Sequence, residues 1–191
     1  MMNKFNVNNE KIDSKILLHA CCAPCALSPV PEFSASGIDY DVFFYNPNIF
    51  DETEHEKRLG EVKKISEIFK FRIFIQKDEY SKFLIYIAGA ENEPEGGARC
   101  AKCFEMRLTA AFEFAAAGGY KFVATTLSTS PHKNVALINS LGRKIAAGYN
   151  NVIRLIEFDF KKNNGYKNSI DYCKKYSIYR QNYCGCHFSK R

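Results

Sequence analysis

Residues 15–25 read KILLHACCAPC, an apolar run that leads directly into three cysteines. The run over residues 15–20 is short and strongly apolar, which predicts a buried β-strand. The proline between the second and third cysteines ends this strand and stiffens the loop after it. We therefore expect the thiols of Cys21, Cys22 and Cys25 just beyond the carboxyl end of a buried strand.

Predicted strands alternate with predicted helices along the rest of the chain. This alternation is typical of an α/β fold with a mainly parallel sheet and helices on both faces. We expect one domain over residues 1–191, with a flexible N-terminus over residues 1–14. The predicted strands are 15–20, 40–45, 71–76, 121–126 and 152–158, and the predicted helices are 51–70, 79–88, 103–118, 131–147 and 169–176.

Length and composition set the class of protein. With 191 residues, 46% of them hydrophobic, the chain can bury one core. No apolar run reaches the roughly 18 residues that a membrane helix needs. Residues 1–15 lack the apolar stretch of a secretory signal, so we expect a cytoplasmic location. Clustered cysteines in such a protein are more often metal-binding or catalytic than structural.

The net charge of +6 is unevenly distributed. Residues 1–95 carry 11 Lys/Arg and 16 Asp/Glu, a net charge of −5, whereas residues 96–191 carry 16 and 5, a net charge of +11. A basic half of this kind suits a surface that binds nucleic acid. The alternative is that the excess lysines only keep the protein soluble.

Cys100 and Cys103 are separated by two residues, a spacing at which two thiolates can hold one metal. A helix beginning at Cys103 would place its N-terminal partial positive charge beside the thiolate. Arg99, Lys102 and Arg107 add positive potential. From this spacing alone, a metal site, a redox pair and coincidence all remain open.

Cys184 and Cys186 flank a glycine near the C-terminus. The glycine permits a tight bend, so the pair can close a strained disulfide that is readily reduced, as an electron relay requires. Alternatively both are metal ligands, with His187 as a further ligand. Cys173 stands alone on a predicted helix, and we expect it in the core.

Four thiolates suffice for a tetrahedral zinc or a [4Fe-4S] cluster. The pair after the first strand and the pair before the long helix supply four, which leaves three thiols for chemistry beside the metal. The expected ligands are Cys21, Cys22, Cys100 and Cys103, and the spare thiols are Cys25, Cys184 and Cys186.

Two other functions compete with an iron–sulfur enzyme. A zinc-stabilised RNA-binding module without catalysis explains the cysteine pairs and the basic half, but not the spare thiols. A general thiol–disulfide oxidoreductase needs one Cys-x-x-Cys and no further thiols. The glycine-rich dinucleotide fingerprint, the Walker A loop and the radical-SAM triad are all missing from the sequence.

Five segments together resemble the QueH-type epoxyqueuosine reductases. The resemblance runs from about residue 16 to residue 189 in the family's order, and its closing YRQxYCGC is highly specific. His132, where many members are expected to have tyrosine, is a small departure. The five segments are HACCAPC (19–25), YNPNI (45–49), RCAKCFEMRL (99–108), TTLSTSPHK (125–133) and YRQNYCGC (179–186).

The resemblance implies a cobalamin-independent enzyme that reduces epoxyqueuosine to queuosine at the wobble position of tRNA. It implies a [4Fe-4S] cluster on the four expected ligands and a redox-active pair at Cys184 and Cys186. It also implies a fold related to the adenine-nucleotide α-hydrolase-like (HUP-like) domains. An electron donor is required, and the sequence does not identify it.

Two further sets of side chains are candidates for this chemistry. We expect Cys25 to assist at an open side of the cluster, with a second iron left open, and Asp159 is a weaker candidate for the same role. Anticodon loops are recognised through base stacking and phosphate contacts. We therefore expect Tyr179, Arg180 and Lys133 to contact tRNA.

Overall fold

Five parallel strands form the single sheet of the computed structural model, which describes residues 12–158, 160 and 164–190. The strand order is β3-β2-β1-β4-β5, and every neighbouring pair is parallel. The predicted α/β class is confirmed, while the HUP-like assignment stays a prediction. The strands are β1 (Ile16–Ala20), β2 (Tyr40–Tyr45), β3 (Ile73–Gln76), β4 (Phe122–Thr125) and β5 (Arg154–Leu155).

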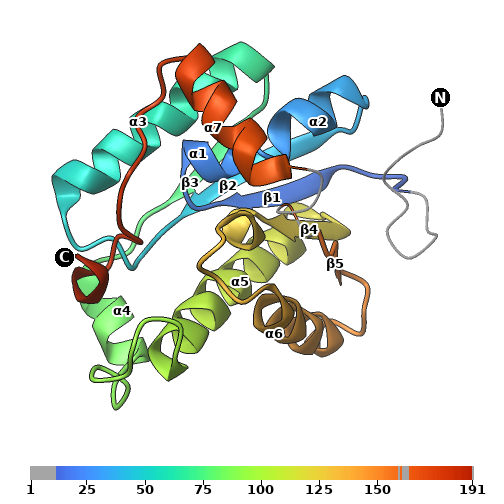
Figure 1. Ribbon diagram of the computed structural model, residues 1–191. Helices are drawn as coiled ribbons and strands as arrows, with labels where there is room; N and C mark the ends of the chain where they lie inside the picture. The colour runs from blue at the N-terminus through green and yellow to red at the C-terminus, as the bar shows by residue number, and fades with distance from the viewer. Residues whose placement is uncertain (1–11, 159, 161–163, 191) are drawn as a thin grey trace.

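Helices cover both faces of the sheet, as Figure 1 shows. The helices α1, α2, α3 and α7 lie over one face, and α5 and α6 lie over the other. None of the described helices combines the length and the apolar character that crossing a membrane would require. The helices are α1 (Ala23–Ala26), α2 (Val30–Ala35), α3 (Glu52–Phe69), α4 (Tyr80–Tyr86), α5 (Ala98–Gly118), α6 (Val135–Gly148) and α7 (Gly165–Lys175), with short 3₁₀ turns η1 (Thr126–Thr129) and η3 (His187–Ser189).

The side chains of β1 alternate between two cores. Ile16 and Leu18 pack in the core shared with α1, α2, α3 and α7, whereas Leu17 packs in the core shared with α5 and α6. Every residue of this strand is fully buried. A central parallel strand is covered on both faces, which explains why its sequence is a continuous apolar run rather than an alternating one.

Several predicted boundaries were wrong, among them the start of the helix expected at residue 169, which begins at Gly165. The helix expected at residue 103 begins at Ala98, so Cys100 and Cys103 both lie on α5, and the helix N-terminus is not at Cys103. The helix expected at residue 131 begins at Val135, because the Asn134 side chain caps it by accepting the N–H of Leu137 at 3.1 Å.

The expected seven-residue strand over 152–158 is also shorter in the structure. Only Arg154 and Leu155 pair with β4, at the edge of the sheet. The expected flexible segment over residues 1–14 lies mostly outside the described residues, as does Asp159.

Candidate metal and thiol centre

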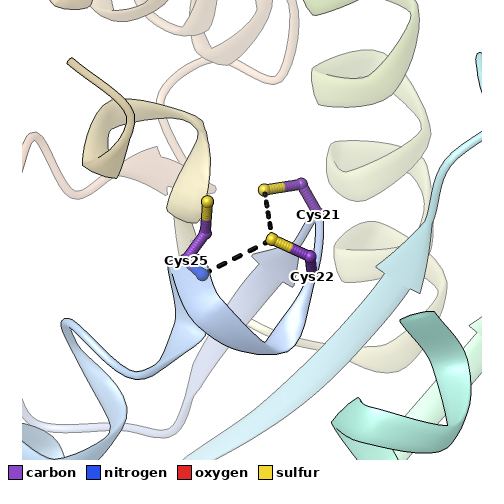
Figure 2. A group of neighbouring side chains, drawn as sticks. All are labelled: Cys21, Cys22 and Cys25. Atoms are coloured by element: carbon purple, nitrogen blue, oxygen red, sulfur yellow. Dashed lines mark hydrogen bonds between the residues drawn. The ribbon is translucent and has the colours of Figure 1, made fainter. Parts of the chain in front are cut away.

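Cys21, Cys22 and Cys25 form a compact thiol group at the carboxyl end of β1 (Figure 2). Their three sulfur atoms all lie within 4.8 Å of one another, and the Cys21 and Cys22 sulfurs are 3.8 Å apart. Cys22 is the N-cap of α1, and its sulfur accepts the backbone N–H of Cys25 at 3.4 Å. The short helix supplies the turn that lets two adjacent cysteines face one point.

Two polar side chains from distant segments donate hydrogen bonds to this thiol group. The Gln181 amide donates to the Cys22 sulfur at 2.8 Å, and the Thr126 hydroxyl donates to the Cys21 sulfur at 3.3 Å. The Thr126 oxygen also accepts the backbone N–H of Cys21 at 3.0 Å. Sequence analysis named neither residue as a candidate, although both lie inside the segments that carry the family resemblance.

The first turns of α5 bring the second cysteine pair to the same region. Cys100 packs in one apolar cluster with Cys21, Cys22 and Cys25, and Gly96 donates its N–H to the Cys100 sulfur at 3.2 Å. Cys103 is buried in the adjoining cluster, together with Cys186. Segments that lie far apart in the sequence therefore converge, as the expected ligand set requires, and the ligand roles themselves stay a prediction.

Cys184 and Cys186 lie beside these thiols on the C-terminal turn, and all eight cysteines carry free thiols. A hydrogen bond from Cys186, together with the nearby charges of Lys133 and Arg107, lowers the pKa of Cys184 to about 5. The same hydrogen bond raises the pKa of Cys186 far above its usual range. The pair thus holds one thiolate and one thiol near neutral pH.

A similar asymmetry exists within the first thiol group. Hydrogen bonds from Cys22 and Cys25 hold the pKa of Cys21 well below its usual range. Burial, followed by the hydrogen bond with Cys21, raises the pKa of Cys22 to about 12. Hydrogen bonds with Cys21 and Cys22 raise the pKa of Cys25 well above its usual range. Each group therefore combines a nucleophilic sulfur with proton-bearing ones.

Arg107 places a buried positive charge near the thiols of Cys21, Cys103 and Cys184. Its side chain is 1% exposed, and Nη2 donates to the Asn46 Oδ1 at 2.5 Å. Burial lowers the pKa of Arg107, but the charges of Cys103, Cys21 and Cys184 outweigh it, so the net shift is upward. Asn46 in turn donates to the Ala20 carbonyl at 3.2 Å, which ties β2 to the residue before the thiols.

His19 joins the ends of three strands behind the site. Its Nε2–H donates to the Tyr45 carbonyl at 3.1 Å, so Nδ1 accepts from the Thr125 hydroxyl at 2.8 Å. Burial, followed by the charge of Arg107, lowers the pKa of His19 to about 3. This histidine is therefore neutral, and it fixes the spacing of the strand ends that carry the thiols.

The expected tRNA contacts lie around the C-terminal segment. The Tyr179 hydroxyl donates to Glu54 at 3.0 Å, and the Lys57 ammonium lies 3.6 Å from the centre of the Tyr179 ring. Arg180 is exposed, and Lys133 is half-buried near the thiols. Their contact with tRNA stays a prediction.

Two remaining candidates lie away from the thiol group. Cys173 is 3% exposed in the core with α1, α2 and α3, in the position expected for a core residue. His187 contacts the Tyr80 hydroxyl at 2.6 Å on the surface, so its ring nitrogen already has a partner.

Buried thiols at the carboxyl edge of a parallel sheet define a cysteine-rich α/β protein whose thiols can hold a metal. The family model described as epoxyqueuosine reductase QueH matches residues 16–191. The chain belongs to this family, which confirms the resemblance seen in the sequence.

Relatives named epoxyqueuosine reductase QueH match most of the chain. The protein of Staphylococcus epidermidis is 39% identical over 92% of this chain and 76% of its own length. The protein of Streptococcus pyogenes is 35% identical over 95% of this chain and 72% of its own length. The protein of Thermotoga maritima is 33% identical over 91% of this chain and 89% of its own length.

Proposed function

We propose that this protein reduces epoxyqueuosine to queuosine at the wobble position of tRNA. The observation that carries this proposal is the convergence of the Cys21, Cys22 and Cys25 sulfurs, within 4.8 Å of one another, with the C-terminal cysteine turn. Membership in the QueH family supplies the substrate.

The dithiol at Cys184 and Cys186 balances the chemistry. Converting the epoxide to an alkene and water consumes two electrons and two protons. Oxidation of two thiols to one disulfide releases two electrons and two protons. Cys184, whose pKa is lowered to about 5, is the thiolate at neutral pH and Cys186 holds the proton, so the pair releases two electrons and one proton, and the second proton comes from solvent. An external reductant then restores the dithiol.

The thiol group fits a soft metal centre. Two of its three cysteines are buried, Gln181 and Thr126 donate hydrogen bonds to the sulfurs of those two, and Arg107 offsets negative charge. The proposed holders of a [4Fe-4S] cluster are Cys21, Cys22, Cys100 and Cys103. When bound, such a cluster transfers single electrons.

Cys25 is the spare thiol that belongs to the thiol group itself. Its sulfur lies within 4.8 Å of those of Cys21 and Cys22, so it is the proposed ligand of a second iron or the group that assists the departing oxygen. In the proposed complex, Tyr179, Arg180 and Lys133 contact the anticodon loop. The setting of this reaction is the cytoplasm.

The test is an anaerobic assay on tRNA that contains epoxyqueuosine, read by mass spectrometry of the nucleosides. We expect queuosine to form with the wild-type chain, and Cys184→Ala to lose at least about 100-fold in rate, because it removes one of the two electron-donating sulfurs. Cys173→Ala is the matched control, because it removes a thiol from the core away from the thiol group.

Metal analysis of the same preparation separates the competing functions. Brown protein with iron and sulfide supports the reductase. Colourless protein that holds zinc, binds tRNA and forms no queuosine would instead identify an RNA-binding module. A metal-free dithiol that is active only on disulfides would identify a general oxidoreductase.

A further inference from the structure

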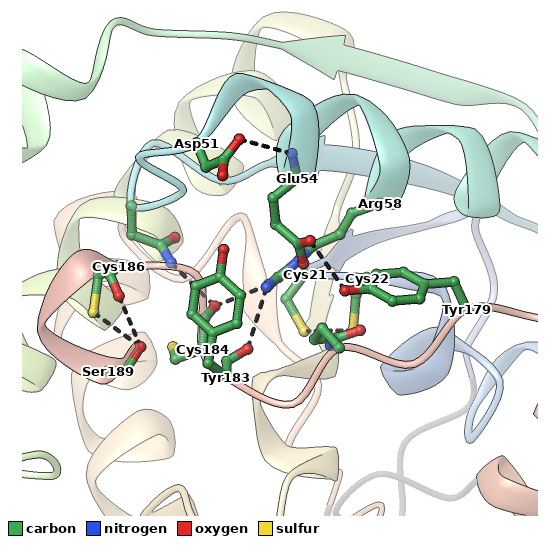
Figure 3. A network of polar contacts seen from close by, with 12 residues as sticks. Cys21, Cys22, Asp51, Glu54, Arg58, Tyr179, Tyr183, Cys184, Cys186 and Ser189 are labelled. Carbon is green, nitrogen blue, oxygen red and sulfur yellow. Dashed lines mark hydrogen bonds and ion pairs between the residues drawn. The ribbon is translucent and has the colours of Figure 1, made fainter. Parts of the chain in front are cut away.

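Arg58 on α3 holds the backbone of the C-terminal cysteine turn, as Figure 3 shows. Its Nη1 donates to the carbonyl of Cys184 at 3.0 Å, and its Nη2 donates to the carbonyl of Tyr183 at 3.2 Å. The guanidinium also lies 5.1 Å from the centre of the Tyr183 ring. One buried side chain thus binds two consecutive peptide carbonyls next to the proposed redox pair.

Arg58 is itself held in one orientation. Its side chain is 3% exposed, and Nε donates to Glu54 at 2.6 Å, one turn earlier on α3. The other carboxylate oxygen of Glu54 accepts the Tyr179 hydroxyl at 3.0 Å. Since all three guanidinium nitrogens have partners, a lysine at this position cannot reproduce the arrangement.

The turn at residues 183–185, where Arg58 binds two of the carbonyls, has no room to shift toward α3. Gly185 has a φ of +119°, and a Cβ added there would lie 2.9 Å from Ile49 and 3.1 Å from the Arg58 Nη1. The Gly185 carbonyl accepts the N–H of Phe50 at 3.3 Å, and Asn48 donates to the Cys184 carbonyl at 3.4 Å. Three successive carbonyls, of residues 183–185, are therefore engaged by α3 and the segment before it.

The sulfur of Cys184 lies near the thiol group while its backbone is held in this way. Gln181, three residues before Cys184, donates to the Cys22 sulfur at 2.8 Å, which places this segment beside the thiol group (Figure 3). Cys186 is anchored separately, since its carbonyl accepts the Ser189 hydroxyl at 2.9 Å. The position of Cys184 therefore depends on the α3 side of the turn.

We propose that Arg58 is a positioning residue whose guanidinium fixes the turn at Cys184, Gly185 and Cys186 and so keeps the Cys184 sulfur beside the Cys21 group. The consequence for catalysis rests on the proposed function. The fixation of the turn does not, and it can be measured without substrate.

The experiment compares Arg58→Gln with Arg143→Gln in the full chain, purified anaerobically with the metal it retains. Arg143 forms an ion pair with Glu157 on the surface. Arg143→Gln is therefore the matched control, because it also removes one arginine and one ion pair. The readout is the alkylation rate of each cysteine, compared between variant and wild type at one fixed pH near 9, above the ordinary thiol pKa of about 8.5, so that a change at Cys184 reports a change in its accessibility.

We expect Cys184 to react at least about tenfold faster in Arg58→Gln, because two charge-assisted hydrogen bonds to its turn are lost. The rates at Cys184 in Arg143→Gln and at Cys173 in every variant should stay within about twofold of wild type. A folded Arg58→Gln protein with a wild-type rate at Cys184 would overturn the proposal. So would an equal rise at Cys173, because it would show general loosening.

Arg58→Lys covers the case in which Arg58→Gln does not fold. One ammonium group can keep the charge but not all three contacts, so we expect an alkylation rate at Cys184 between those of wild type and Arg58→Gln. A wild-type rate at Cys184 in Arg58→Lys would by itself count against the proposal. In the reductase assay, Arg58→Lys should lower kcat more than it raises KM. If the wild-type chain proves inactive on tRNA, the alkylation rates still decide whether Arg58 holds the turn.

Discussion

Single residues decide how the thiols differ from one another. Cys21 and Cys184 have lowered pKa values, because hydrogen bonds from neighbouring thiols stabilise their ionised forms, and Cys22 and Cys186 hold protons. Gln181 and Arg107 add a hydrogen bond and a charge that no cysteine spacing supplies. The chemistry of each sulfur therefore follows from its neighbours in space.

The hydrogen bond from Gln181 to the Cys22 sulfur can be tested at this scale. We expect Gln181→Ala to lower the affinity for the bound metal by about 10- to 100-fold, because outer hydrogen bonds orient a ligand and stabilise its charge. The measurement is iron per chain, with visible absorption, during titration with a chelator. Asn182→Ala is the control, since that neighbouring side chain is exposed, and equal metal loss in both variants would contradict the assigned role.

At the scale of elements, parallel strands place the site by ending at one edge. Cys21 follows β1, Asn46 follows β2, and Thr126 follows β4. His19 holds these three strand ends together through Thr125 and Tyr45. The helix α5 then brings its two cysteines to the same edge, so the site requires the sheet to be assembled.

Asp41 links strands of the sheet and gives the fold a pH dependence. Burial raises the pKa of Asp41, but hydrogen bonds from Arg72 at 2.9 Å and Tyr120 at 2.6 Å outweigh it, so its pKa lies below the usual value. The ionised carboxylate therefore stabilises the fold above about pH 4, and this contribution is lost as the pH falls through the lowered pKa.

We expect Asp41→Asn to lower the free energy of unfolding by about 1–3 kcal/mol near pH 7, because it removes charge-assisted hydrogen bonds. The difference from wild type should shrink near pH 3, where the wild-type carboxyl is becoming protonated. Urea unfolding at both pH values checks this. A difference that is equally large at both would show that the charge of Asp41 has no part in it.

At the scale of the whole molecule, charge is divided between the two halves of the chain. The net charge is −5 over residues 1–95 and +11 over residues 96–191. The second half contributes α5, Lys133 and the C-terminal segment to the thiol centre. The positive charge is thus concentrated in the half that contains all three proposed tRNA contacts.

This distribution predicts a strong effect of salt on tRNA binding. We expect the affinity to fall steeply between low and physiological salt, because phosphate contacts release counterions. Arg180→Gln should weaken binding and reduce the slope of log affinity against log salt by about one. Binding titrations at several salt concentrations measure this, with Arg143→Gln as the control, and a flat response in the wild type would remove the electrostatic argument.

Local patterns predicted much of the fold and the cysteines of the site. The strand over residues 40–45 matches β2, and the helix expected over residues 51–70 matches α3, which Asp51 caps, because burial on both faces and capping are local in the sequence. The start of α5 at Ala98 and the two-residue β5 were missed. Both depend on packing against segments that are distant in the sequence, and the local pattern of apolar residues does not predict such packing.

The amino-acid sequence by itself determined the α/β class, the family and the cysteines available to a metal, because each follows from residue identity and spacing. Only the tertiary structure decided that Cys25 joins Cys21 and Cys22, that Gln181 reaches Cys22, and that Arg58 holds the C-terminal turn. The contact of Cys25 is local, but the other two join residues more than a hundred positions apart in the sequence. Directed hydrogen bonds between such residues exist only once the chain has folded.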